Sequence, residues 1–293
     1  MNYPPYSHYE LFTMNYSLGD RFQGAFWGVT IAHQLTSSQI PKYPFESDRQ
    51  AITQGIEWIY QSACNPIPKG EPPHKRWIHL PGQQSLIALL PLWLYNGSQS
   101  LGISPHFHHI PLPPSTDHYN EEVSPLTLGQ FSDIITSVLT QLLQPSLSVA
   151  NLMNALEASC SSVIPTNKPL QSFRNRLHHP TSLSAIIDEL NTDTVLPPAI
   201  LALLLGLYYS ISLQSQARLA LKRACFNSPS PQLTTLLTAI ILGASQGSYC
   251  FPCAWKYNNS VGKNWQNLTI RLMAIWSGVY QVEVDSLRLL SGG

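Results

Sequence analysis

The stretch VLPPAILALLLGLYYSISLQSQ, residues 195–216, carries no charged side chain and decides the fold of this chain. It is long enough to cross a bilayer, but two features favour a buried helix at the centre of a globular protein. Pro197 and Pro198 suit the first turn of a helix, where a backbone amide hydrogen has no partner in any case. Serine and glutamine then accumulate from Ser210 onward. We therefore expect a buried central helix at about Pro197–Leu213 and no membrane span.

Helical periodicity continues outward from this segment in both directions. Apolar residues recur at spacings of three and four, and no series of alternating strands with hairpin turns is visible. The sequence therefore predicts an all-α fold in which residues 1–293 form a single compact multi-helix domain. The other helices are expected at about Asp20–Leu35, Ser47–Ala63, Gln83–Tyr95, Leu128–Leu143, Ser148–Ser161, Ser182–Leu190, Ser215–Cys225, Gln232–Gln246 and Lys263–Gln281.

The charge content limits the classes of partner. Charged residues make up 11% of the chain, against about 25% in a typical soluble domain. The 16 acidic and 16 basic residues cancel, which leaves no electrostatic basis for binding nucleic acid or an anionic membrane. A surface with so few charges favours association, so we expect a protein partner or self-association.

The cysteines and the N-terminal segment indicate the cellular compartment that we expect for the protein. Five widely spaced cysteines do not form a disulfide framework, and we expect reduced thiols. Cys250 and Cys253 form a CFPC run, which we interpret as chance spacing because no second pair of zinc ligands and no preceding strand accompany it. The opening MNYPPYSHYELF has no basic segment followed by an apolar run. A signal peptide is therefore not expected, and a cytoplasmic location is predicted.

Two proline-rich stretches, residues 65–73 and 104–116, predict surface loops. Histidines gather in and just after the second stretch, so a metal site is one interpretation of it. Imidazoles on a proline-rich loop have no fixed geometry, and we favour an exposed loop without a metal or any other cofactor. These histidines are His106, His108, His109 and His118.

A longer pattern follows the central helix, in ALKRACFNSPSPQLTTLLTAIILGASQGSYCFPCAW, residues 220–255. It resembles the C-terminal signature of the ADP-ribosylglycohydrolase family, AL..A...GGDTDT.AAIAGALAGA..G....P..W. Small residues at Ala239, Gly243 and Gly247 predict a smooth helix face that packs closely on another helix. The matching positions, reached without a gap, are Ala220, Leu221, Ala224, Gly243, Ala244, Gly247, Pro252 and Trp255.

Other parts of the chain support the same resemblance. The segment DRFQGAFWGVTIAHQL, residues 20–35, is similar to the family opening DR..GALLG.A.GDALG. VLPPAILALLLG, residues 195–206, occupies the place of the family helix that precedes the C-terminal signature. The central TDDT motif should fall at residues 80–84, where an apolar helix follows but the motif itself is missing. The agreeing opening positions are Asp20, Arg21, Gly24, Ala25 and Gly28.

The resemblance implies an enzyme that holds two magnesium ions with the carboxylates of these motifs. Such an enzyme cleaves a glycosidic bond of ADP-ribose. Magnesium requires oxygen ligands, several of them charged, and a paired metal site cannot exchange its carboxylates freely. The motif carboxylates are replaced here by neutral residues, so we do not expect the family's metal site. Ser230 with Pro231 predicts a plain helix cap instead. The ligand motifs fall on Ala32 and His33, on Gln83 and Gln84, and on Ser230 and Gln232.

These observations favour a catalytically inactive relative of the family that acts as a binding, scaffold or regulatory subunit through protein contacts. A metal-independent sensor of ADP-ribose or a related nucleotide is the first alternative, because amides and hydroxyls can hydrogen-bond a ribose or base without metal. A weak hydrolase that uses another acid, such as Glu46, Asp48 or Glu57, is the second, and an unrelated helical protein is the third. The residues of the candidate pocket are His33, Gln34, Gln83, Gln84, Ser230 and Gln232.

Overall fold

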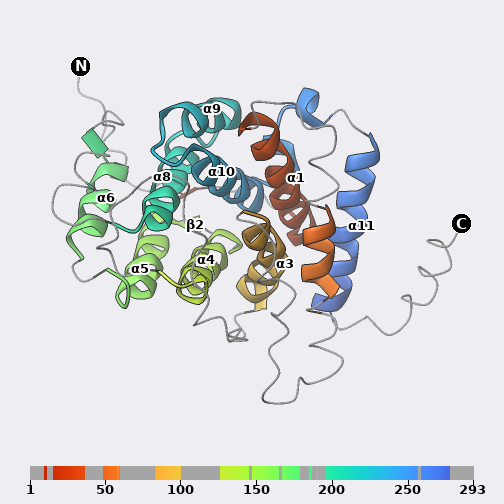
Figure 1. Ribbon diagram of the computed structural model, residues 1–293, viewed down its shortest axis with the longest axis horizontal. Coiled ribbons are helices and arrows are strands. Elements are labelled where there is room, and N and C mark those ends of the chain that lie inside the picture. The colour runs from red at the N-terminus through yellow and green to blue at the C-terminus, as the bar shows by residue number, and fades with distance from the viewer. Residues whose placement is uncertain are drawn as a thin grey trace, which may run out of the picture.

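The computed structural model describes residues 10–11, 16–36, 49–57, 59, 83–99, 126–144, 147–164, 167–178, 185–186, 190, 196–256 and 259–277. Over these residues the chain is an all-α compact domain, as predicted (Figure 1). Residues 49–57 and 59 are helical. The named α-helices are α1 (Leu18–Thr36), α3 (Gln83–Gln99), α4 (Leu128–Leu142), α5 (Val149–Cys160), α6 (Lys168–His178), α8 (Pro198–Ser212), α9 (Ala217–Asn227), α10 (Pro231–Gln246) and α11 (Asn259–Trp276).

Short elements complete the described part. Two 3-10 helices, η2 (Ser248–Cys250) and η3 (Cys253–Lys256), connect α10 to α11. Strands β1 (Glu10–Leu11) and β2 (Leu147–Ser148) form a two-residue antiparallel ladder that the sequence analysis did not predict. The ladder is too short to show a strand pattern in sequence.

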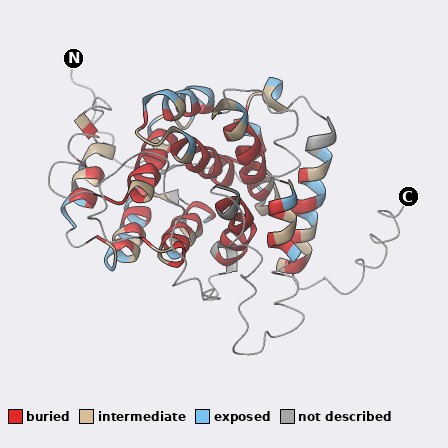
Figure 2. Cartoon of the chain, viewed as in Figure 1, coloured by how far each residue is buried: buried red, intermediate tan, exposed pale blue. Residues whose placement is uncertain are grey.

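Helix α8 confirms the predicted buried central helix. Pro197 is its N-cap residue and Pro198 begins the helix. Every residue from Ile200 to Ser210 is buried, and α8 packs mainly against α10 and α9. Figure 2 shows burial concentrated on α8, α10, α1 and α3, with exposed faces on α9 and α11. None of the helices in the described ranges combines the length and apolar character that a membrane span requires.

Helices α1 and α10 lie in unusually close contact, as the small residues predicted. A Cβ atom added to Gly28 would lie 2.5 Å from the carbonyl oxygen of Ala239, and one added to Gly24 would collide with the carbonyl oxygen of Gly243. These two contacts run in opposite directions along the chain, so the helices are antiparallel. Glycine is required here because two backbones occupy the space of a side chain.

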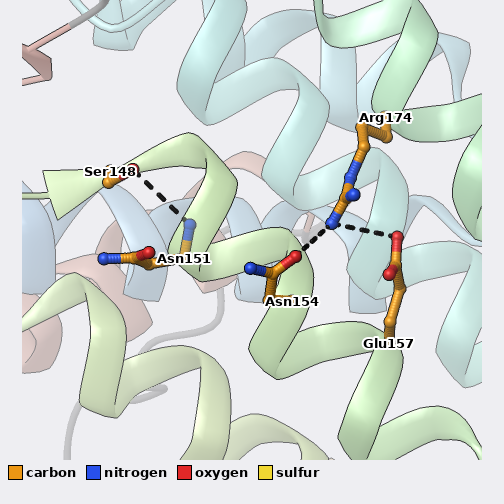
Figure 3. Close-up of polar contacts among 5 residues, drawn as sticks. All are labelled: Ser148, Asn151, Asn154, Glu157 and Arg174. Atoms are coloured by element: carbon orange, nitrogen blue, oxygen red, sulfur yellow. Dashed lines mark hydrogen bonds and ion pairs between the residues drawn. The ribbon is translucent and has the colours of Figure 1, made fainter.

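Helix α6 is not among the helices that the sequence patterns predict. Its segment, KPLQSFRNRLH, is short and strongly polar, but Pro169 in its first turn and apolar residues at Leu170, Phe173 and Leu177 were usable signals. Arg174 of α6 donates a 2.6 Å hydrogen bond to Asn154 and lies 3.2 Å from a carboxylate oxygen of Glu157, both on α5 (Figure 3). Leu170 and Phe173 of α6 are fully buried, so α6 is held by a narrow apolar face together with these polar contacts to α5.

Several expectations fall partly or wholly outside the described residues. Both proline-rich stretches lie there, with the histidines of residues 106–118. Of the helix expected at Ser182–Leu190, only residues 185, 186 and 190 are described, and all three are helical. Helix α11 begins four residues earlier than expected, at Asn259.

Candidate functional site

The ends of three helices meet where the resemblance places two of the family's ligand motifs. The Cys225 thiol, near the end of α9, donates to the carbonyl oxygen of Leu35 at the end of α1, with 3.4 Å between Sγ and O. Burial raises the pKa of this thiol, and a hydrogen bond with the side chain of Thr235, in the first turns of α10, opposes that shift. Cys225 therefore joins the end of α1 to the start of α10, and we call this region the helix junction.

Four of the six candidate pocket residues belong to the helix junction. His33 and Ser230 are half-buried, whereas Gln34 and Gln232 are exposed. The antiparallel course of α1 and α10 brings all four to the same end of the helix pair. Gln83 and Gln84 begin α3, and their side chains lie outside the described part of the chain.

The start of α10 differs in one detail from the cap that the sequence predicts. Ser230 is the N-cap residue and Pro231 begins the helix, as expected, but the Ser230 hydroxyl makes no capping hydrogen bond. The φ and ψ angles of Ser230 are −118° and 76°, outside the extended conformation in which a capping hydroxyl reaches the second or third amide. The Ser230 carbonyl oxygen instead accepts the Thr234 amide at 2.9 Å.

Asp20 and Arg21, which match the DR of the family opening, have structural roles. Ser17 Oγ donates to a carboxylate oxygen of Asp20 at 2.7 Å and accepts from the Asp20 amide at 3.1 Å, which closes the first turn of α1. Arg21 is buried and donates to the carbonyl oxygens of Leu142 and Gln144, at 3.1 and 3.2 Å. A cation suits this position because the last carbonyls of α4 have no partner within their own helix. Burial lowers the pKa of Arg21.

The side chains described at the ligand-motif positions of the helix junction are poor ligands for a hard cation such as Mg²⁺. The described ligand-motif positions hold the buried Ala32 together with His33, Ser230 and Gln232. In the part of the chain that the structure describes, no three histidine, cysteine, aspartate or glutamate side chains are grouped closely enough to hold a metal ion. Among the alternative acids, Glu57 is exposed near the end of helix 49–57, and Glu46 and Asp48 lie outside the described residues.

The CFPC run has the wrong electrostatics for a redox pair. Cys250 is partly buried and donates to the Gly247 carbonyl oxygen at 3.1 Å. Burial raises its pKa to about 12, although Lys256 and a backbone hydrogen bond act in the opposite direction. A redox CxxC cysteine requires a lowered pKa, so the raised pKa of Cys250 disfavours a redox role for this thiol.

Comparisons with protein-family models, with curated proteins and with solved structures gave no match. The ADP-ribosylglycohydrolase resemblance therefore rests on the motif residues alone and stays a prediction. The all-α fold and the contacts of the helix junction do not depend on it.

Proposed function

We propose that this chain is a non-catalytic, ADP-ribosylglycohydrolase-like protein that acts as a binding, scaffold or regulatory subunit by contacting another protein. One observation carries the proposal: the motif residues that pack the helices together are present, whereas the motif residues that would bind metal are not. The small residues of the motifs remain in contact, with Gly24 and Gly28 of α1 against Gly243 and Ala239 of α10. At the helix junction, by contrast, the positions at which the family motifs have carboxylates hold Ala32, His33, Ser230 and Gln232.

Loss of these charges removes the means of hydrolysis that the resemblance implies. A magnesium pair activates water and offsets the charge that develops on the leaving group. Histidine, serine and glutamine do not replace several carboxylates around a hard cation. Hydrolysis by that route then has no activator, while the helices that surrounded the site can still present a surface.

Exposed aromatic side chains support a role in protein contact. Phe226 and Tyr249 are 78% and 70% exposed, and such side chains gain most from burial against a partner. Cys160, Cys225, Cys250 and Cys253 are free thiols. Free thiols suit the reducing cytoplasm, where we propose that the protein works.

The proposal is tested on the full chain with ADP-ribose, titrated with and without magnesium. We expect no hydrolysis of ADP-ribosylated substrate and no magnesium-dependent rise in melting temperature. A ligand that binds only the folded state stabilises it by about 2.7 kcal/mol at a free concentration of about 100 times Kd, which a thermal scan resolves. Turnover or a magnesium-dependent rise would overturn the proposal.

A second test addresses the protein contact itself. Size-exclusion chromatography with light scattering, together with co-purification at endogenous levels, should show a stable complex or a self-associated form. A strict monomer that co-purifies with nothing would contradict a scaffold role.

A metal-independent sensor of ADP-ribose or a related nucleotide is a second candidate. The favouring observation is that His33, Gln34, Ser230 and Gln232 come to one end of the α1–α10 pair with partly or fully exposed side chains. A rise in melting temperature with ADP-ribose that needs no magnesium, and that disappears in a Gln34→Ala/Gln232→Ala variant, would favour this function.

A further inference from the structure

The outer face of α9 combines apolar and cationic side chains. Ala217, Ala220, Leu221 and Ala224 are buried, at the spacing of one helix face. At about 100° per residue, Leu219 and Phe226 then lie on the opposite face, two turns and about 10 Å apart. Leu219 is 36% exposed and Phe226 is 78% exposed.

Three cations accompany these two apolar side chains. Lys222 lies between Leu219 and Phe226 on the outer face, and Arg218 and Arg223 lie on its two flanks. All three are exposed. We call Arg218, Leu219, Lys222, Arg223 and Phe226 together the α9 face.

Nothing in the neighbouring sequence neutralises these cations. Between Asp193 and Glu283 the chain contains no aspartate or glutamate, but six lysines and arginines. The helices that pack most closely on α9 are α10, α8 and α1. Their only acidic residue is Asp20, which lies beside Gly247, at the end of α10 remote from the helix junction.

The cations of the α9 face are correspondingly unpaired within the described residues. Neither Arg218 nor Lys222 makes an ion pair or a side-chain hydrogen bond to another residue that the structure describes. Arg223 lies near Tyr208 and Tyr209 of α8, where its charge lowers the pKa of each phenol against the larger raising effect of burial. Arg218 and Lys222 are therefore the cations most available to a partner.

The geometry points to the α9 face as a docking surface for an acidic protein segment that carries at least one large apolar side chain. The apolar residue would cover Phe226 and Leu219, and the carboxylates would pair with Arg218 and Lys222. Aromatic residues and arginine are the side chains that most often dominate protein interfaces. This inference rests on the proposed function, since it names the chemistry of the protein partner.

Two other anionic partners fit the α9 face less well. A membrane-surface helix needs a broad apolar face that enters the lipid, whereas only two large apolar side chains of α9 point outward. Nucleic-acid binding usually neutralises several phosphates, whereas the α9 face presents three cations. An acidic, partly apolar segment matches both the number and the arrangement of these side chains.

The experiment is selection of random 16-residue peptides on the immobilised full chain, followed by affinity measurement with a synthetic peptide of the enriched sequence. We expect enriched peptides with more aspartate and glutamate than lysine and arginine, and with at least one leucine, phenylalanine or tryptophan. Phe226→Ala and Lys222→Glu should each weaken binding by about tenfold, as removal of an interface hot spot does. Higher salt should also weaken binding, because exposed charges are screened.

Matched variants on α11 serve as controls. Ile270→Ala removes another exposed apolar side chain, and Lys263→Glu reverses another exposed cation. Both should bind the peptide within about twofold of the unaltered chain, because neither residue belongs to the α9 face. Equal melting temperatures of all four variants would show that each remains folded.

Several outcomes would overturn the inference. These are the absence of enriched peptides, enrichment of non-acidic peptides, or equal binding by the α9 and α11 variants. Stronger α9-dependent binding to phosphatidylserine vesicles or to single-stranded DNA than to the peptide would also overturn it. ADP-ribose hydrolysis is measured on the same proteins, so turnover with intact peptide binding would refute the proposed function alone.

Discussion

At the scale of single residues, backbone contacts at a few glycines determine how closely the central helices approach. Gly24 and Gly243 face each other so closely that a Cβ on either would meet the backbone of the other helix. Backbone atoms cannot rotate away as a flexible side chain can, so added volume must push the helices apart.

We predict opposite effects for two alanine substitutions in α1. Gly24→Ala should lower the free energy of unfolding by about 1–3 kcal/mol or more, because the added methyl group overpacks the α1–α10 contact. Gly19→Ala should raise it by up to about 1 kcal/mol, because alanine favours the helix. Among the residues that the structure describes, a Cβ at Gly19 would meet the side chains of Ser17 and Thr269, at 3.8 and 3.9 Å.

Urea unfolding of both variants beside the unaltered chain measures these differences. The two substitutions share the same change of side chain, so their difference isolates the effect of packing. A Gly24→Ala variant as stable as Gly19→Ala would contradict the close contact of α1 with α10.

At the scale of secondary-structure elements, two helices with similar start signals begin differently. Thr127 caps α4 through a reciprocal pair of bonds: its hydroxyl accepts the Gln130 amide at 3.2 Å, and the Gln130 side chain accepts the Thr127 amide at 3.0 Å. Ser230 occupies the same position before α10, but its hydroxyl makes no such bond. Proline at the first position of α10 provides a fixed φ angle instead.

The two caps should therefore respond differently to alanine. Thr127→Ala should destabilise the protein by about 1 kcal/mol, because it leaves a helical amide without a partner. Ser230→Ala should cost less than about 0.5 kcal/mol, because no capping bond is lost. Equal losses in chemical unfolding would show that Ser230 caps α10 after all.

The secondary-structure elements also show which features of the fold can be predicted from sequence patterns. The uncharged segment of α8 and the paired small residues of α10 were sufficient to predict a buried helix and a close-packed helix face, because both depend on residue type at helical spacing. Helix α6 is not among the predicted helices, because its strongly polar composition outweighs the helical spacing of Leu170, Phe173 and Leu177. The neutral character of the candidate pocket was also readable in the sequence. The meeting of its residues at the helix junction was not, since it depends on the packing of α1 against α10.

At the scale of the whole molecule, buried thiols link stability to alkaline pH. Cys160 is fully buried and Cys250 is partly buried, and burial raises the pKa of both from 9.0 to about 12. The unfolded chain loses these protons first, so the folded state binds more protons between pH 9 and 12. The contribution of the two buried, neutral thiols to the free energy of unfolding is therefore fully present below pH 9, and it decreases as pH rises through this interval.

We predict that the free energy of unfolding decreases from pH 9 upward, by as much as about 1.4 kcal/mol per pH unit for each thiol. Urea unfolding between pH 8 and 10 measures this slope, to which Tyr208 and Tyr209 also contribute toward pH 10 because burial raises their pKa. Cys160→Ala should lower stability at pH 8 and also flatten the slope. An unaltered slope in the Cys160→Ala variant would refute the assignment.

The amino-acid sequence by itself determined the helical class, the buried central helix, the close-packed face of α10 and the absence of carboxylates at the positions that the resemblance assigns to metal ligands. Each of these follows from which residue types recur within a few turns of one helix. Only the tertiary structure decided that Gly24 meets Gly243, that Cys225 joins the ends of α1 and α9, and that the α9 face stays uncovered by the described residues. Such contacts join segments far apart in the chain, and they depend on how whole helices pack rather than on any local pattern.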